Sequence, residues 1–251
     1  MAATEISVRA YEVVAEIPHG IRESDLHVNC CTDYDRVAST PENEANIDKI
    51  WKDRITSNPS LFNGTKFRFH SVDMRSDQPT IQLGITDYKT YLGTNLSSAW
   101  SNLDQSNLAS PLGNAAIVET TDEQIVLLKR SGNVGECPHT VVMPGGHPEP
   151  EMVGVRTMAG WEDRSNNNDE EDADWSKDIA KELFDSMIRE VVEETGIPQN
   201  NLGNVLCIGF TRRVLNHRPD IIFYIPCIIS PRAKLRQCTL PGQNTNRNRR
   251  S

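Results

Sequence analysis

The sequence lacks several features that would place it in a specialised class of protein. No uninterrupted apolar run reaches the roughly 18–20 residues that a membrane span requires. The N-terminus has neither the basic start nor the apolar core of a secretory signal peptide. The six cysteines show no C-x-x-C spacing and are too sparse for a disulfide framework. These absences predict a protein of a reducing compartment, the cytoplasm or also the nucleus, with no membrane partner.

The chain also lacks a surplus of positive charge. It has 26 lysines and arginines against 35 aspartates and glutamates, which gives a formal net charge of −9. A sequence-independent grip on nucleic acid depends on lysine and arginine at the phosphates, so no nucleic-acid partner is expected. An acidic protein that acts on an anionic substrate needs local cations or a bound metal ion. The sequence does not indicate an oligomeric state.

Hydrophobic periodicity predicts the secondary structure. Thr40 as N-cap and Pro41 in the first turn begin a helix over residues 40–55. The clearest helix covers residues 178–196 and is ended by its last glycine and the proline that follows. A third helix or turn is predicted over residues 87–100. Alternating or continuous apolar residues predict strands within the first forty residues and over residues 66–72, 80–86, 115–120, 124–130, 139–146, 204–213 and 220–229, with 66–72 paired to 80–86 and 115–120 forming a hairpin with 124–130.

This order of elements predicts an α/β (α+β) fold with a mixed sheet. A smaller N-terminal α+β region, residues 1–110, is expected to contribute to substrate binding and to precede a catalytic domain over residues 111–235. Within that domain, residues 147–176 are polar and strongly acidic, which predicts a solvated insertion. Residues 236–251 are basic and poor in apolar side chains, which predicts a disordered tail.

Glu190 and Glu194 fall inside the apolar arc of the helix over residues 178–196. When side chains are projected at about 100° per residue, both lie on the same side as Met187, and Glu193 lies at the edge of the arc. Unpaired ionised carboxylates cost several kcal/mol to bury, so such groups must be protonated, paired or bound to a cation. The alternative is a solvated helix face. Since magnesium is typically held by one or two carboxylates plus substrate phosphates, the pattern predicts that Glu190 and Glu194 bind Mg²⁺, or Mn²⁺ in its place.

The stretch R-E-V-V-E-E-T-G-I at residues 189–197 and the M-P-G-G turn at residues 143–146 resemble the two halves of the Nudix box. The resemblance implies a Nudix-type α/β/α sandwich with a mixed sheet. It also implies that Glu190, Glu193 and Glu194 are catalytic, with Glu193 the nearest candidate for the general base. Arg189 is implied to orient the glutamates through a salt bridge.

The sequence departs from the Nudix box in two places. The acidic stretch separates Gly146 from the helix by some thirty residues, where the family usually has a short loop. Lys181 stands where the box has its first glutamate, and Glu182 follows one step late. The metal site is therefore expected to depend on Glu190 and Glu194.

Short stretches within residues 45–228 are similar to one branch of the Nudix family, which cleaves UDP-glucose and UDP-galactose to UMP and a sugar 1-phosphate. That branch has the same long insertion and imperfect first glutamate. The resemblance implies a nucleotide-sugar substrate. Each expected binding role has a plainer alternative: residues 93–95 can form a merely structural turn, His147 can cap its loop, and Arg212 can be a surface arginine. Arg213 is a weaker candidate for substrate binding than Arg212. The residues expected to bind the substrate are Tyr88, Thr94, Asn95, Gly145, Gly146, His147 and Arg212.

Two other interpretations stay open. A non-catalytic Nudix-like module that binds a nucleotide or a protein is favoured by Lys181. A Nudix hydrolase for another nucleotide derivative, such as coenzyme A, is favoured by the faint resemblance of L-L-K-R-S at residues 127–131 to that branch. Related chains continue beyond residue 230 with a strand and a closing helix, so apolar sheet surface is expected to be exposed here and stability to be reduced.

Overall fold

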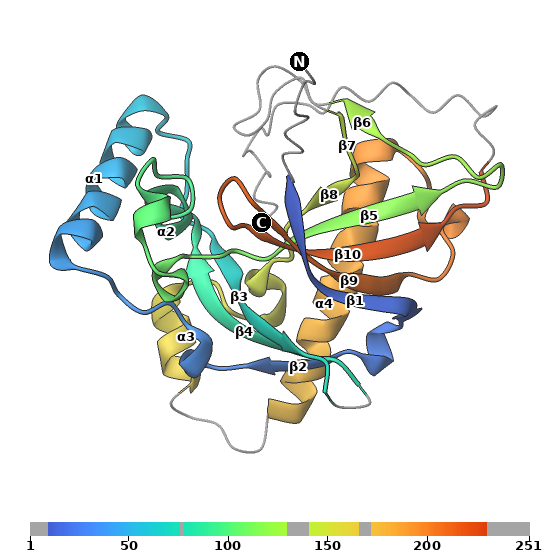
Figure 1. Cartoon of the computed structure of the whole chain (residues 1–251), viewed down its shortest axis with the longest axis horizontal. Helices are drawn as coiled ribbons and strands as arrows, with labels where there is room; N and C mark the ends of the chain where they lie inside the picture. Colours follow the sequence, from blue (N-terminus) through green and yellow to red (C-terminus); the bar gives the residue numbers. More distant parts are fainter. Residues whose placement is uncertain (1–9, 76–77, 130–140, 166–171, 230–251) are drawn as a thin grey trace, which may run out of the picture.

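The structure is a computed structural model that describes residues 10–75, 78–129, 141–165 and 172–229. Its centre is a five-stranded sheet with the order β1-β9-β10-β5-β8, beside a three-stranded sheet with the order β2-β4-β3 (Figure 1). A two-stranded ribbon, β6-β7, completes the sheets of this part of the chain. The strands are β1 (Tyr11–Ile21), β2 (His27–Cys30), β3 (Thr65–Asp73), β4 (Thr80–Asp87), β5 (Gly113–Glu119), β6 (Leu128–Lys129), β7 (Val141–Val142), β8 (Gly145–Gly146), β9 (Leu206–Arg213) and β10 (Pro219–Pro226).

Both larger sheets mix parallel and antiparallel pairs. In the five-stranded sheet β5 and β10 are parallel, whereas β1 with β9, β9 with β10 and β5 with β8 are antiparallel. In the three-stranded sheet β2 and β4 are parallel and β3 and β4 are antiparallel, as the alternation of their sequences predicts. The predicted mixed α/β (α+β) class is confirmed.

The helices that begin at Pro41 and Tyr88 start where the sequence signals place them, whereas the helix predicted over residues 178–196 begins earlier, at Asp172. The hydroxyl of Thr40 accepts a hydrogen bond from the N–H of Asn43 at 3.3 Å, and so caps the first long helix. The carboxylate of Asp87 caps the next helix by accepting from the N–H of Thr90 at 2.8 Å. The α-helices are α1 (Pro41–Ser57), α2 (Tyr88–Gly93), α3 (Met158–Ser165) and α4 (Asp172–Thr195), and the short 3-10 helices are Glu23–Asp25, Thr32–Tyr34, Trp100–Asn102, Gln105–Asn107, Pro150–Val153 and Gln199–Asn201.

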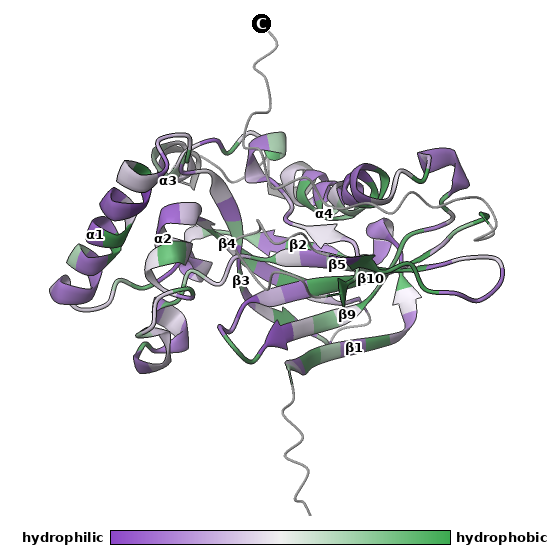
Figure 2. Ribbon diagram, turned by 90° about the horizontal axis from the view of Figure 1, so that it is seen from above, coloured by the Kyte–Doolittle hydropathy of each residue, from purple (hydrophilic) through white to green (hydrophobic). Residues whose placement is uncertain are grey.

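The helix α4 covers one face of the five-stranded sheet (Figure 2). Its apolar side chains recur every fourth residue and are completely buried. The ring of Phe184 meets the ring of Phe223 on β10 edge to face, with 4.9 Å between centroids. The core stripe on α4 consists of Ile179, Leu183, Met187 and Val191.

The predicted boundary at residue 110 does not separate two units in the described part of the chain. β1 comes from the first half of the sequence but forms the edge of the five-stranded sheet beside β9. Phe69 of β3 stacks on Phe210 of β9 at 5.9 Å, and the hydroxyl of Ser176 on α4 donates to the carbonyl of Val28 at 2.7 Å. The N-terminal elements and the later elements therefore share one hydrophobic core.

Within residues 147–176, which the sequence predicts to be a solvated insertion, the described residues are partly exposed and partly buried. Val155, Trp161 and Trp175 are 1%, 1% and 6% exposed and belong to the core. The two indole rings stack at 5.7 Å, and Trp161 donates its N–H to the carboxylate of Asp35 at 2.7 Å. Apolar anchors within an acidic sequence thus fold part of this stretch onto the N-terminal elements.

The predicted hairpin between residues 115–120 and 124–130 forms only at its turn. The N–H of Thr120 donates to the carbonyl of Gln124 at 2.9 Å, and Glu119 bridges Ile125, but β6 then pairs with β7 instead of β5. The predicted disordered tail, residues 236–251, lies outside the described residues. Within those residues, no helix is both long and apolar enough to cross a membrane.

Candidate active site

A stripe of polar side chains recurs every fourth residue along α4, next to its apolar stripe. We call Glu182, Ser186, Glu190 and Glu194 the polar stripe. Four residues turn an α-helix by about 40° more than a full turn, so the stripe winds slowly and keeps facing neighbouring backbone. Glu182 and Ser186 are 4% and 1% exposed, whereas Glu190 and Glu194 are only half-buried. The two less buried carboxylates of the polar stripe therefore lie in the last two turns of the helix.

The two half-buried carboxylates converge on the glycine strand β8. The N–H of Gly145 donates to Oε2 of Glu194 at 2.9 Å. A β-carbon on Gly146 would overlap Oε1 of Glu190, so this close approach requires glycine. The structure thus brings four predicted site residues together, namely Gly145, Gly146, Glu190 and Glu194. They meet at the C-terminal turns of α4.

Glu182 ties the loop after the glycine strand to α4. Its Oε1 accepts from the guanidinium of Arg189 at 2.6 Å and from the N–H of Glu149 at 2.9 Å. Arg189, expected to orient the glutamates, forms its salt bridge with this buried carboxylate. Lys181, which stands in the place of the first box glutamate, is exposed and pairs with Asp185. Glu182, which stands one residue after the position of the first box glutamate, therefore anchors the loop after β8 to α4.

Lys66 of β3, which is not among the predicted site residues, brings a positive charge to this region. Burial lowers the pKa of its ammonium group, while the negative charges of Glu149 and Glu190 act in the opposite direction. The neighbouring Thr65 hydroxyl donates to the carbonyl of Val155 at 2.9 Å, which holds β3 against the loop after the glycine strand. The alternation of residues 66–72 indicates that Lys66 points away from the apolar face, but it does not say what the side chain meets.

His147 follows the glycine strand and lies among cations. Its pKa is held well below the usual range by burial and by the charges of Lys66, Arg218 and Arg213. Its imidazole is consequently neutral at pH 7, with one ring N–H to donate and one ring nitrogen to accept.

The two neighbouring arginines of β9 have different surroundings, because successive side chains of a strand point to opposite faces. Arg213 influences His147 and lies over the ring of Tyr11 at 5.9 Å. Arg212, the one expected to bind substrate, instead lowers the pKa of His217 in the β9–β10 hairpin, after burial as the larger cause. Arg218, which the sequence analysis does not identify, pairs with buried Asp220 at 2.8 Å. Of the two neighbouring arginines, Arg213 is therefore the one whose charge acts on His147, and the predicted contact of Arg212 with substrate stays a prediction.

The turn over residues 93–95, expected to face the ligand, is internal. Asn95 is 0% exposed, and its amide accepts from the N–H of Ser110 at 3.0 Å and donates to the carbonyl of Asn216 at 2.9 Å. Thr94 is 1% exposed, and its hydroxyl donates to the carbonyl of Thr90 at 2.7 Å. The polar groups of Thr94 and Asn95 are thus buried and bonded within the protein, which favours a structural turn, and their roles in binding stay a prediction.

The ring of Tyr88 makes a packing contact. It meets Trp51 of α1 edge to face at 6.4 Å and an interplanar angle of 89°, and is half-buried there. The contact joins α2 to α1 at the end of the molecule where both helices lie (Figure 1).

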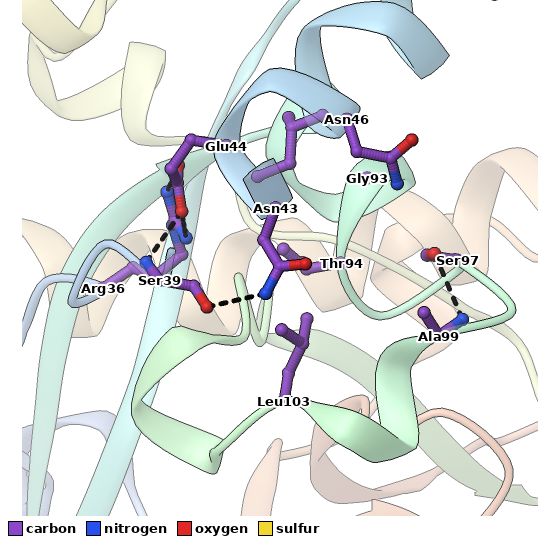
Figure 3. A pocket seen from close by; sticks show the side chains of 11 residues that line it. Arg36, Ser39, Asn43, Glu44, Asn46, Gly93, Thr94, Ser97, Ala99 and Leu103 are labelled. Carbon is purple, nitrogen blue, oxygen red and sulfur yellow. Dashed lines mark hydrogen bonds and ion pairs between the residues drawn. The ribbon is translucent and has the colours of Figure 1, made fainter. Parts of the chain in front are cut away.

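A small pocket lies between α1 and the segment that follows α2 (Figure 3). Thr94 lines it together with Arg36 and Glu44, whose side chains form a salt bridge with 2.9 Å between NH1 and Oε1. On the same wall, the amide of Asn43 donates to the hydroxyl of Ser39 at 2.9 Å. Because these groups bond to one another, the pocket offers a ligand little polar chemistry, and the carboxylates beside the glycine strand are the better candidate site.

The residues beside β8 suit a metal that takes few protein ligands. Within the described residues, no group of three or more His, Cys, Asp or Glu side chains could hold a metal ion. Glu190 and Glu194 provide two carboxylates, one of them with an oxygen fixed by the N–H of Gly145. Magnesium fits such a pair, because it keeps several waters and completes its shell with substrate phosphates.

Comparison with known proteins relates the chain to enzymes. No protein-family model matches it. It is 40% identical over 235 residues to Nudix hydrolase 9 of Arabidopsis thaliana, covering 86% of this chain and 74% of that protein. It is 32% identical over 234 residues to uridine diphosphate glucose pyrophosphatase NUDT22 of Bos taurus, covering 85% and 75%. The NUDT22 protein of Homo sapiens is 31% identical over 227 residues, covering 84% and 71%.

Proposed function

The chain belongs to the Nudix hydrolases, and we propose that it hydrolyses the diphosphate bond of UDP-glucose and UDP-galactose to UMP and a sugar 1-phosphate. The observation that carries the proposal is the convergence of Glu190 and Glu194 on Gly145 and Gly146. Relatives named uridine diphosphate glucose pyrophosphatase support the substrate class.

Glu190 and Glu194 are the proposed ligands of Mg²⁺, or of Mn²⁺ in its place. Residues four apart on a helix lie on one side of it, so their oxygens are directed into one volume. When bound, the ion neutralises charge on phosphoryl oxygens and makes a coordinated water more acidic. The N–H of Gly145 restricts the rotation of the Glu194 carboxylate, so the backbone prepares this ligand.

Cations around His147 are proposed to face the diphosphate. Lys66 and the guanidinium groups of Arg213 and Arg218 act on this imidazole from β3, from the end of β9 and from the residue before β10. Guanidinium groups suit phosphate oxygens, because their N–H groups form paired, charge-assisted hydrogen bonds. These side chains therefore supply the local positive charge that a protein with a net charge of −9 needs for an anionic substrate.

The proposed reaction is the attack of water on one phosphorus atom. A bond forms between the water oxygen and that phosphorus, and the bond from the same phosphorus to the bridging oxygen breaks. The bridging oxygen leaves with the other phosphate, and a base takes the proton of the water. Glu193 is the proposed base, because it is an exposed carboxylate residue directly before Glu194 in the last turns of α4.

The test is a product assay on the full chain with Mg²⁺ and four substrates: UDP-glucose, UDP-galactose, ADP-ribose and coenzyme A. A phosphatase converts monoester products to phosphate, and chromatography identifies UMP and the sugar 1-phosphate. We expect turnover of the two UDP-sugars and its loss when EDTA removes the ion. Turnover of coenzyme A alone, or equal turnover of UDP-sugars with EDTA, would contradict the proposal.

A further inference from the structure

A buried amide on β5 joins the glycine strand to α4. Oδ1 of Asn114 accepts from the N–H of Gly146 at 2.7 Å, and Nδ2 donates to the hydroxyl of Ser186 at 2.9 Å. Ser186 in turn donates to the carbonyl of Leu183 at 3.1 Å. Asn114 and Ser186 are 2% and 1% exposed, so this chain of hydrogen bonds is shielded from water.

The amide of Asn114 lies next to the strand on which the Glu190 carboxylate packs. Asn114 lies opposite Gly146 in the pairing of β5 with β8. Ser186 belongs to the polar stripe and lies one helical turn before Glu190, whose carboxylate packs on Gly146. One side chain therefore links the strand and the helix at the point where the helix brings Glu190 to the strand.

The N–H groups of the two glycines are held by different side chains. Glu194 accepts from Gly145 and Asn114 accepts from Gly146. The first hydrogen bond involves a proposed metal ligand, which must also turn an oxygen toward an ion. The second involves a buried, neutral amide, which carries no charge to coordinate an ion and so has no competing role.

We propose that Asn114 is a positioning residue of this site. Through Ser186 it fixes the separation of the glycine strand from α4, and thereby keeps Glu190 and Glu194 at the spacing that a divalent ion needs. An amide suits the position because it can accept from Gly146 and donate to Ser186 at once. This inference rests on the proposed metal site, and it concerns how the ligands are held.

The test compares Asn114→Leu and Ser186→Ala with the wild-type full chain. Leucine keeps the branched shape and the number of side-chain heavy atoms and removes both hydrogen bonds, and alanine removes the helix partner alone. Ser176→Ala is the matched control, since this α4 serine bonds to Val28 at the other end of the helix. Mn²⁺ binding is measured by electron paramagnetic resonance without substrate, and kcat and KM are measured with UDP-glucose and Mg²⁺.

We expect Asn114→Leu to weaken Mn²⁺ binding and to lower kcat by about 10–100-fold, as for other residues that orient metal ligands. KM should change less than kcat, and the Mn²⁺ spectrum should broaden as the ligand geometry becomes irregular. Ser186→Ala should change the same quantities in the same direction by a smaller factor. Ser176→Ala should stay within about twofold of wild type, since its hydroxyl serves a different contact.

Wild-type Mn²⁺ affinity and kcat in both folded variants would overturn the inference. If Asn114→Leu does not fold, Ser186→Ala decides alone by the same criterion. A wild-type chain that binds Mn²⁺ without cleaving UDP-glucose would contradict the proposed function, while the Mn²⁺ affinities would still decide the role of Asn114. A wild-type chain that binds no Mn²⁺ would contradict both.

Discussion

The glycine strand β8 and the turn over residues 93–95 both gather polar groups beside glycine, but they use them differently. At the turn, a β-carbon on Gly93 would collide with Ile47, and the side chain of Asn95 bonds to backbone groups of the buried interior. At the strand, Gly146 makes room for the carboxylate of Glu190, which is half-buried. The comparison teaches that glycine permits close packing in both places, but only the strand leaves charged oxygens within reach of a ligand.

Removal of one carboxylate from the strand region should have the largest effect. We expect Glu194→Gln to lower kcat on UDP-glucose by at least about 100-fold, a loss of the size seen when a group that stabilises transition-state charge is removed. Steady-state kinetics at several Mg²⁺ concentrations measures it. Glu151→Gln is the matched control, because Glu151 is 60% exposed and 4.0 Å from Arg156. Near-normal turnover by Glu194→Gln at saturating Mg²⁺ would remove this helix from the mechanism.

A methyl group on the glycine strand should act in the same direction. We expect Gly146→Ala to lower kcat by about 10–100-fold, because its β-carbon must displace the Glu190 carboxylate. Gly160→Ala is the control, since Gly160 is exposed on α3 and its β-carbon would meet only the Thr157 hydroxyl, at 3.2 Å, so kcat should stay close to wild type. Equal kinetics for the two variants would show that the contact between Gly146 and Glu190 has no functional weight.

The turn should respond through stability. Asn95→Ala leaves the N–H of Ser110 and the carbonyl of Asn216 buried without this partner, so we expect the free energy of unfolding to fall by about 2–3 kcal/mol. Urea denaturation followed by circular dichroism measures the change. An unchanged stability together with lost affinity for UDP-glucose would restore the turn as a binding element and would undo the comparison.

Loss of the cation from β3 should have the smallest effect. We expect Lys66→Met to raise KM for UDP-glucose by about tenfold, the equivalent of one charge-assisted hydrogen bond to phosphate. Lys89→Met is the control, since Lys89 forms a salt bridge with Asp48 at 2.5 Å and belongs to α2. A KM unchanged by Lys66→Met would show that the diphosphate does not contact this ammonium group.

Features set by local sequence could be predicted. The cap at Thr40 and the apolar stripe of α4 depend on neighbouring residues, and the same periodicity placed Glu190 and Glu194 on the docking side of their helix. The resemblance to the Nudix box also indicated the glycine turn as part of the same site. In the structure, Gly145 of that turn donates to Glu194.

Features set by distant contacts could not be predicted. Asn95 donates a hydrogen bond to the carbonyl of Asn216, 121 residues away in the sequence. Hydrophobic periodicity describes neighbouring residues only and cannot predict such a bond. Trp161 is buried in the core although its surroundings in sequence are acidic, and its N–H bonds to Asp35, 126 residues away. The strand pattern around Lys66 gives the side on which the side chain lies, but the charges it meets come from the loop after β8 and from α4.

The most direct test of the central claim is a crystal structure of the chain grown with Mn²⁺ and recorded at a wavelength where manganese scatters anomalously. The account predicts one strong anomalous peak beside Gly146, with carboxylate oxygens of Glu190 and Glu194 within about 2–2.3 Å of it, close to the range for hard divalent ions. A well-ordered site without a peak, or a peak bound only by other residues, would contradict it.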